Sequence, residues 1–145
     1  PDGFESSSKL SYNTADEALN VAGRINTSKI NIDGDMRCTG AVYQNITSTS
    51  DEVYEVREQD YTILCDAHTN PVIVSLPPAC NSTGRVITVK KTNTNKHSIR
   101  SNPVAIKVSE GTIDLTDRVI LKMNYSSRTL QSDGNNWWVI GAKGS

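Results

Sequence analysis

The chain of 145 residues lacks most of the features that mark the common classes of protein. It has one phenylalanine and two methionines, and its apolar fraction of 36% is low, so any hydrophobic core must be thin. No apolar run approaches the roughly 18 residues of a membrane helix, which argues against membrane insertion, and the N-terminal PDGFESSSKL does not resemble a signal peptide. The net charge of −1 and the scattered lysines and arginines argue against nucleic-acid binding.

Residue types that carry out catalysis or hold metals are also sparse. The three cysteines, Cys38, Cys65 and Cys80, are far apart and form no CxxC pair, so we expect reduced, mostly buried thiols; one Cys65–Cys80 bridge remains open. His68 and His97 lie in polar, turn-rich segments without a nucleophile motif, which is typical of solvated loop histidines. We therefore expect no enzyme activity and no cofactor.

One short stretch, NIDGD, is faintly like a calcium-binding loop. It places Asn31, Asp33 and Asp35 at alternate positions, but the later glutamate of such a loop is missing. We expect no metal site.

The N-terminal third contains an internal repeat. LNVAGRINTSK (19–29) is followed by INIDGDMRCTG (30–40), and each unit alternates apolar residues around a central glycine. This pattern predicts short strands joined by a turn or bulge. Two or three such units bury little apolar surface in one chain, so we expect several chains to wind about one axis. Just before the repeat, TADEALNVAG (14–23) is the best helix candidate, with Thr14 as the N-cap.

Short alternating runs dominate the rest of the chain. A polar linker is predicted at 48–56. We predict eight strands in this region, with turn-forming residues between them: 53–58, 61–66, 71–76, 85–91, 104–108, 118–123, 127–132 and 136–141. This spacing predicts an all-β fold, with an antiparallel, jelly-roll-like β-sandwich as its architecture.

The last two predicted strands flank Asp133-Gly134 and read as a hairpin. Because neighbouring residues of a strand face opposite sides, Trp137 should be buried with Val139, while Trp138 and Ile140 share the other face. A face that carries tryptophan and isoleucine should be covered. We therefore predict that Trp138 and Ile140 contact a neighbouring subunit or the base of the domain, and that Trp138→Ala weakens the assembly without changing ligand specificity.

The C-terminal region resembles the head domains that end phage and viral tail-fibre proteins, and those of bacterial fibre adhesins. The resemblance rests on Tyr61-Thr62, Leu76-Pro77, Gly84 with Val86 to Lys90, Thr112-Ile113-Asp114, and the closing LQSDGNNW at 130–137. The repeat also resembles the Leu-x-Val-x-Gly units of trimeric fibre shafts. The cysteines are not part of this pattern, and we expect no self-cleaving chaperone module after the head.

The resemblance implies a homotrimer, with an intertwined β-repeat stalk at residues 1–47 and a globular head at 48–145. Its implied role is host attachment: a non-enzymatic fibre tip on a virion that binds a receptor on a host or prey cell surface, often a glycan. A bacterial trimeric surface adhesin, a purely structural trimerisation or spacer domain, and an enzyme acting on surface polysaccharide remain alternatives. The stalk residues expected at the trimer interface are Leu19, Val21, Ile25, Ile30, Ile32 and Met36.

Binding residues cannot be carried over from the family, whose loops vary, so they are proposed from residue type. Exposed aromatics and adaptable polar loops suit sugar recognition, and the loop TNTNKH (92–97) ranks first because it is long and polar. The candidates for ligand binding are Tyr43, His68, Asn93, Asn95, Lys96, His97 and Tyr125.

Overall fold

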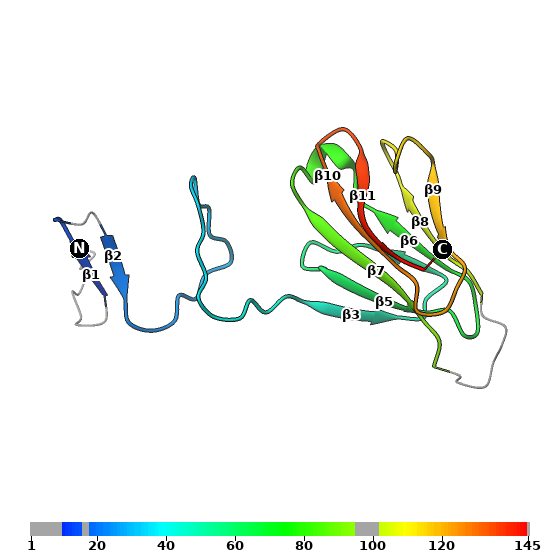
Figure 1. Cartoon of the computed structure of the whole chain (residues 1–145), viewed down its shortest axis with the longest axis horizontal. Coiled ribbons are helices and arrows are strands. Elements are labelled where there is room, and N and C mark those ends of the chain that lie inside the picture. The colour runs from blue at the N-terminus through cyan, green and yellow to red at the C-terminus, as the bar shows by residue number, and fades with distance from the viewer. Residues whose placement is uncertain (1–9, 16–17, 95–101, 145) are drawn as a thin grey trace. The chain divides into compact units, whose positions relative to one another are not determined.

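The structure, a computed structural model, describes residues 10–15, 18–94 and 102–144 (Figure 1). Their regular structure is β-strand apart from one 3-10 turn, η1 (Ala79–Asn81), so the prediction of an all-β fold is confirmed. Contacts divide the chain into two units, Pro1–Ala41 and Val42–Ser145. The boundary expected after residue 47 falls inside a strand, and the contacts place residues 42–47 with the second unit.

The N-terminal unit contains a two-stranded antiparallel sheet of β1 (Leu10–Asn13) and β2 (Ala18–Val21). The predicted helix over 14–23 is therefore wrong. A helix of one or two turns is costly to nucleate and needs a packing surface, whereas a hairpin satisfies its backbone groups locally. Of the strands predicted within the repeat, only β2 forms, and residues 22–45 contain none. Strands there would need a partner strand, which the single chain does not supply.

The second unit consists of two sheets. A five-stranded sheet has the order β11-β10-β7-β5-β3, and a four-stranded sheet has the order β4-β6-β8-β9. Every strand predicted from sequence in this region is present, and β3 is added to them. Their bounds are β3 (Ile46–Thr49), β4 (Val53–Glu55), β5 (Thr62–Asp66), β6 (Val72–Leu76), β7 (Val86–Thr92), β8 (Val104–Val108), β9 (Arg118–Leu121), β10 (Ser127–Ser132) and β11 (Trp137–Lys143).

The pairing within these sheets is mixed, so the predicted antiparallel, jelly-roll-like arrangement is wrong. From β3 to β8, consecutive strands alternate between the two sheets, and within each sheet the next strand pairs in parallel with the one before it. The chain thus winds through three coils, each with one strand in either sheet. Only β9, β10 and β11 pair antiparallel with their neighbours. Parallel neighbours need a crossover connection, and here the strand in the opposite sheet provides it.

The core lies between the sheets and is filled by alternate residues of each strand. Residues of β5, β6 and β7 alternate between buried and half-buried, as expected for strands with one face on the core. Trp137 is fully buried, and its indole N–H donates to the Pro77 carbonyl over 3.1 Å. The prediction that Trp137 is the buried tryptophan is confirmed. Trp138 is 38% exposed on the opposite face.

The last hairpin is confirmed, with a bulge that the sequence did not reveal. Gly134 has a φ of 94°, a left-handed conformation that glycine adopts without strain, in the turn between β10 and β11. The register shifts between Thr129 and Leu130, which pair with Gly141 and Val139, so Ile140 is the extra residue of the bulge.

A buried carboxylate fastens the first coil to the second. Asp60 accepts hydrogen bonds from the Thr47 hydroxyl at 2.6 Å, the Tyr54 hydroxyl at 2.7 Å and the Arg57 amide at 2.8 Å. These donors come from β3, β4 and the turn after β4. Arg85, before β7, adds bonds to the backbone carbonyls of residues 57, 58 and 60. The network closes the connection between β4 and β5.

The cysteines are all free, so the structure contains no Cys65–Cys80 bridge. Cys65 is buried in β5, and burial raises the pKa of its thiol to about 12, which makes it unreactive. Cys38 and Cys80 are exposed, contrary to the expectation that most of the thiols are buried. Both cysteines lie in turns or loops and outside the core.

Candidate functional site

A depression lies where the parallel strands of the five-stranded sheet end. Its volume is about 440 Å³, and it opens on the outer side of β3, β5 and β7. The chain joins this sheet at the other end of β3, where the Asn45 carbonyl accepts a hydrogen bond from the Thr62 amide. The depression therefore lies at the end of the second unit that is remote from this junction. Its lining residues are Ser48, Thr49, Ser50, Leu64, Asp66, Thr92 and Thr94.

Asp66 is the charged group of the depression. Its carboxylate accepts hydrogen bonds from the Thr94 hydroxyl at 2.7 Å and from the amides of His68 at 3.1 Å and Thr94 at 3.4 Å. Partial burial raises the pKa of this carboxyl, but these hydrogen bonds and the nearby His68 imidazole lower it more, so the net shift is downward. Asp66 is therefore ionised at neutral pH and held in a fixed orientation.

The remaining lining residues are mostly hydroxyl-bearing. Each serine or threonine hydroxyl donates one hydrogen bond and accepts others, and an ionised carboxylate only accepts. Leu64 adds an apolar side chain, and most of the exposed surface of the depression is apolar. Such a surface matches a ligand with many hydroxyl groups and patches of C–H surface, and it offers no nucleophile paired with a general base.

Three of the residues predicted for ligand binding gather near this end of the unit. His68 is joined to Asp66 through its amide, and its Nδ1 is buried without a hydrogen bond to any described residue. The Tyr125 hydroxyl donates to the Asn93 carbonyl at 3.5 Å. Tyr125 has a left-handed φ of 64° and is half exposed. Asn93 is buried, so little of its side chain is open to a ligand.

The other predicted residues are not brought to the depression. Asn95, Lys96 and His97 lie outside the described residues, so their predicted role stays a prediction. Tyr43 is 94% exposed and precedes β3, at the end opposite the depression. Of the loop that ranked first from the sequence, Thr92 and Thr94 do line the site.

Sequence reasoning missed the residues contributed by β3. Ser48, Thr49 and Ser50 fall in the segment predicted as a polar linker. The one available signal was the alternation of small hydroxyl residues at 47–50, which suits a strand at the edge of a sheet but is weak.

A second, smaller depression adjoins Trp138. Its volume is about 300 Å³, and Gln131, Ser132, Asp133, Trp138 and Ile140 line it. The Trp138 indole N–H donates to the Asp133 carboxylate at 2.7 Å, which fixes the ring. We had expected apolar neighbours, yet the structure surrounds Trp138 with polar ones as well as Ile140. Trp138 is level with Gln131 and Val86, at the end of the sheet where the chain joins it.

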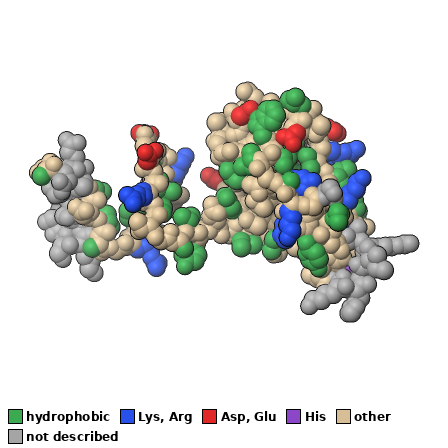
Figure 2. All heavy atoms as spheres, in the orientation of Figure 1, with side chains coloured by type: hydrophobic (Ala, Val, Ile, Leu, Met, Phe, Trp, Pro, Cys, Tyr) green, Lys and Arg blue, Asp and Glu red, His purple; other side chains and the backbone are tan. Residues whose placement is uncertain are grey.

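The N-terminal segment leaves its apolar side chains uncovered. Those predicted for the trimer interface are between 51% and 68% exposed, except the half-buried Val21, and hydrophobic side chains, green in Figure 2, lie at the surface of this segment. Apolar side chains at regular intervals without a covering element mark a surface that another chain can cover. The five exposed residues are Leu19, Ile25, Ile30, Ile32 and Met36.

Neither a metal cluster nor a membrane helix is found in the part of the chain that the structure describes. No three or more His, Cys, Asp or Glu side chains gather there to hold an ion. No helix among these residues has the length and apolar character needed to cross a membrane. No protein-family model matches the chain, and no curated protein is significantly similar to it.

Proposed function

We propose that the protein is the receptor-binding tip of a trimeric fibre, and that the depression around Asp66 holds a surface glycan. The observation that carries the proposal is this hydroxyl-lined and carboxylate-lined depression, at the end of the head remote from the junction with the N-terminal segment. The resemblance of the sequence to tail-fibre heads supports the same role. On this proposal the protein belongs to a virion, with a bacterial surface as the alternative.

Recognition would rest on the fixed carboxylate and on the hydroxyls around it. Asp66 keeps free lone pairs beside its three hydrogen bonds, and sugar hydroxyls can donate to them. Ser48 and Ser50, both exposed, can donate or accept, and Leu64 can contact the C–H face of a sugar ring. A site this open binds weakly by itself.

A trimer compensates for weak binding. Three linked sites raise the apparent affinity by a factor of about 10² to 10⁴ without any new contact. The uncovered apolar residues of the N-terminal segment support association of several chains through the stalk. The purely structural alternative, a spacer with recognition elsewhere, predicts that the depression can be altered without loss of attachment.

Asp66→Asn should weaken glycan binding by about tenfold or more, because the amide replaces a charge-assisted hydrogen bond worth roughly 1.5–3 kcal/mol. The measurement is binding of the whole chain to a glycan array and to host cells. Glu110→Gln, on an exposed loop away from the lining residues, is the matched control and should bind as the wild type does.

Ser48→Trp provides a second test that leaves Asp66 and its hydrogen bonds in place, because it fills the depression from β3. Binding should be lost while the unfolding temperature stays unchanged. Attachment unaffected by both variants would support the spacer function. Loss of binding in Trp138→Ala alone, with the oligomeric state of the wild type retained, would move the site to the second depression.

A further inference from the structure

The outer face of the four-stranded sheet carries a row of apolar side chains across its full width. The register aligns Val53 of β4 with Ile73 of β6, Ile73 with Ala105 of β8, and Ala105 with Ile120 of β9. All four side chains point away from the core, since Tyr54, Val74, Ile106 and Leu121 beside them are buried. Val53 is 54% exposed and Ile120 is 38% exposed. The row is uncovered at both edges of the sheet.

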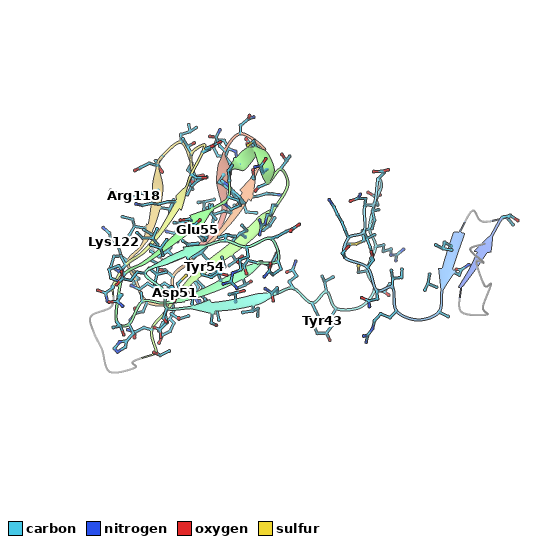
Figure 3. The ribbon with its side chains drawn as sticks, turned by 180° about the vertical axis from the view of Figure 1, so that it is seen from behind. Tyr43, Asp51, Tyr54, Glu55, Arg118 and Lys122 are labelled. Carbon is cyan, nitrogen blue, oxygen red and sulfur yellow. The ribbon has the colours of Figure 1, made fainter. Side chains whose placement is uncertain are left out.

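Charged residues flank the apolar row, and their sign differs between the two edges. In the next row the register aligns Glu55 with Ser75, Ser75 with Lys107, and Lys107 with Arg118. On the other side of the apolar row, Asp51 precedes β4 and Lys122 follows β9. The β4 edge is thus acidic and the β9 edge is basic at both flanking positions (Figure 3).

These charges have no partners among the residues that the structure describes. Asp51, Glu55, Arg118 and Lys122 are exposed, and within the described residues their side chains make no hydrogen bond or ion pair. Two strands, β6 and β8, lie between the acidic edge and the basic edge. A second copy is the one molecule certain to carry the complementary edge in the same register.

The strand directions allow that match. β4, β6 and β8 are parallel and β9 is antiparallel to β8, so β9 runs opposite to β4. If the β9 edge of one copy lies beside the β4 edge of the next, Glu55 meets Arg118, Val53 meets Ile120 and Asp51 meets Lys122. The three contacts alternate acid–base, apolar–apolar and acid–base.

We infer that a second copy of this chain docks head to tail on the four-stranded sheet, with its basic β9 edge against the acidic β4 edge. This contact uses two different surfaces, so it closes into a ring or grows into a filament. The inference rests on the trimeric stalk of the proposed function, which limits the ring to three copies. The apolar rows of the three copies then face the axis, where water is excluded.

Edge charges have another known use, which is to prevent edge-to-edge aggregation of sheets. The two explanations differ in their response to charge reversal. If the edges dock, Glu55→Lys and Arg118→Glu should each weaken association of the whole chain by about tenfold or more at physiological salt, and the double variant should restore it. If the charges only keep copies apart, neither single reversal weakens association, and that result would overturn the inference.

If the stalk alone holds the chains together, charge reversal at the sheet edges does not change association. Disulfide cross-linking then tests the contact between the β4 and β9 edges. Cys38 and Cys80 are first replaced by serine, since both are exposed. Glu55→Cys with Arg118→Cys should then give, on oxidation, covalent species of up to three chains, while each single cysteine variant gives at most two. The matched control places the pair at Glu110 and Lys143, on a loop and on the other sheet, and should give no ladder.

The outcomes separate this inference from the proposed function. One outcome is a trimer, with three times the chain mass of 15.8 kDa, that forms no cross-link between positions 55 and 118 and tolerates both charge reversals. That result would overturn the docking geometry alone. Cross-linking through Trp138→Cys and Ile46→Cys instead would place the interface on the five-stranded sheet. A monomer would contradict the stalk as well, whereas glycan binding lost in Asp66→Asn would leave the inference untouched.

Discussion

Trp137→Ala should reduce the free energy of unfolding of the head by about 3–5 kcal/mol, the largest effect we expect of any single substitution. Trp137 is fully buried, and it is the largest side chain of the core. Its loss would leave a cavity and would remove the donor to the Pro77 carbonyl. That bond fastens β11 to the segment after β6, so the variant also loosens the link between the two sheets.

The neighbouring tryptophan supplies the control. Trp138 is partly exposed, and its indole bonds to the exposed Asp133, so Trp138→Ala should cost no more than about 1 kcal/mol of intrachain stability. Urea unfolding at several protein concentrations measures both variants and separates folding from assembly. Equal losses of stability would show that the assignment of the two faces of β11 is wrong.

Asp60→Ala is expected to destabilise the head by about 3 kcal/mol. The carboxylate is buried and accepts three hydrogen bonds, so its removal strands the hydroxyls of Thr47 and Tyr54 and the Arg57 amide without an acceptor. Asp51→Ala removes an exposed carboxylate a few residues away and should leave intrachain stability nearly unchanged. Thermal unfolding of both variants compares them directly. A stable Asp60→Ala variant would mean that the first coil is held by its strand pairing alone.

The same carboxylate makes stability depend on pH. Burial raises the pKa of Asp60, but the hydrogen bonds from Thr47, Arg57 and Tyr54 lower it more, so its folded pKa lies below the unfolded value. The contribution of Asp60 to the free energy of unfolding is then fully present above the pKa of the unfolded state, about 3.9. It is lost as the pH falls through the lower pKa of Asp60 in the folded state. The stability difference between wild type and Asp60→Asn should therefore narrow below about pH 4. A difference that widens there would reverse the assigned direction.

Strands with strong apolar alternation could be read from the sequence, and so could the face that each residue takes. Val72 to Leu76 and the Trp137–Trp138 pair are examples, because period-two burial follows directly from strand geometry. The partner of each strand could not be read. Turns such as Thr69-Asn70-Pro71 look the same whether the chain returns beside the last strand or crosses to the opposite sheet. That ambiguity is why parallel coils were expected to be antiparallel hairpins.

The candidate site was predicted only in part, because the pairing of the strands could not be read from the sequence. Polar loop ends such as Thr92 and Thr94 were visible, whereas Ser48 and Asp66 meet only because β3 and β5 pair in parallel. Strand β3 itself escaped notice because, of its four residues, only Thr49 is buried. The leucine and isoleucines of the repeat are exposed in the single chain, and their predicted place at an interface between chains stays a prediction.

The solution mass of the whole chain tests the fibre-tip account most directly. Sedimentation equilibrium at micromolar concentration should give three times the chain mass of 15.8 kDa, because the stalk residues and the sheet edges are each covered only in an assembly. A species of 15.8 kDa that persists as the concentration rises would contradict the trimeric stalk, the head-to-tail contact and the avidity on which weak glycan recognition depends.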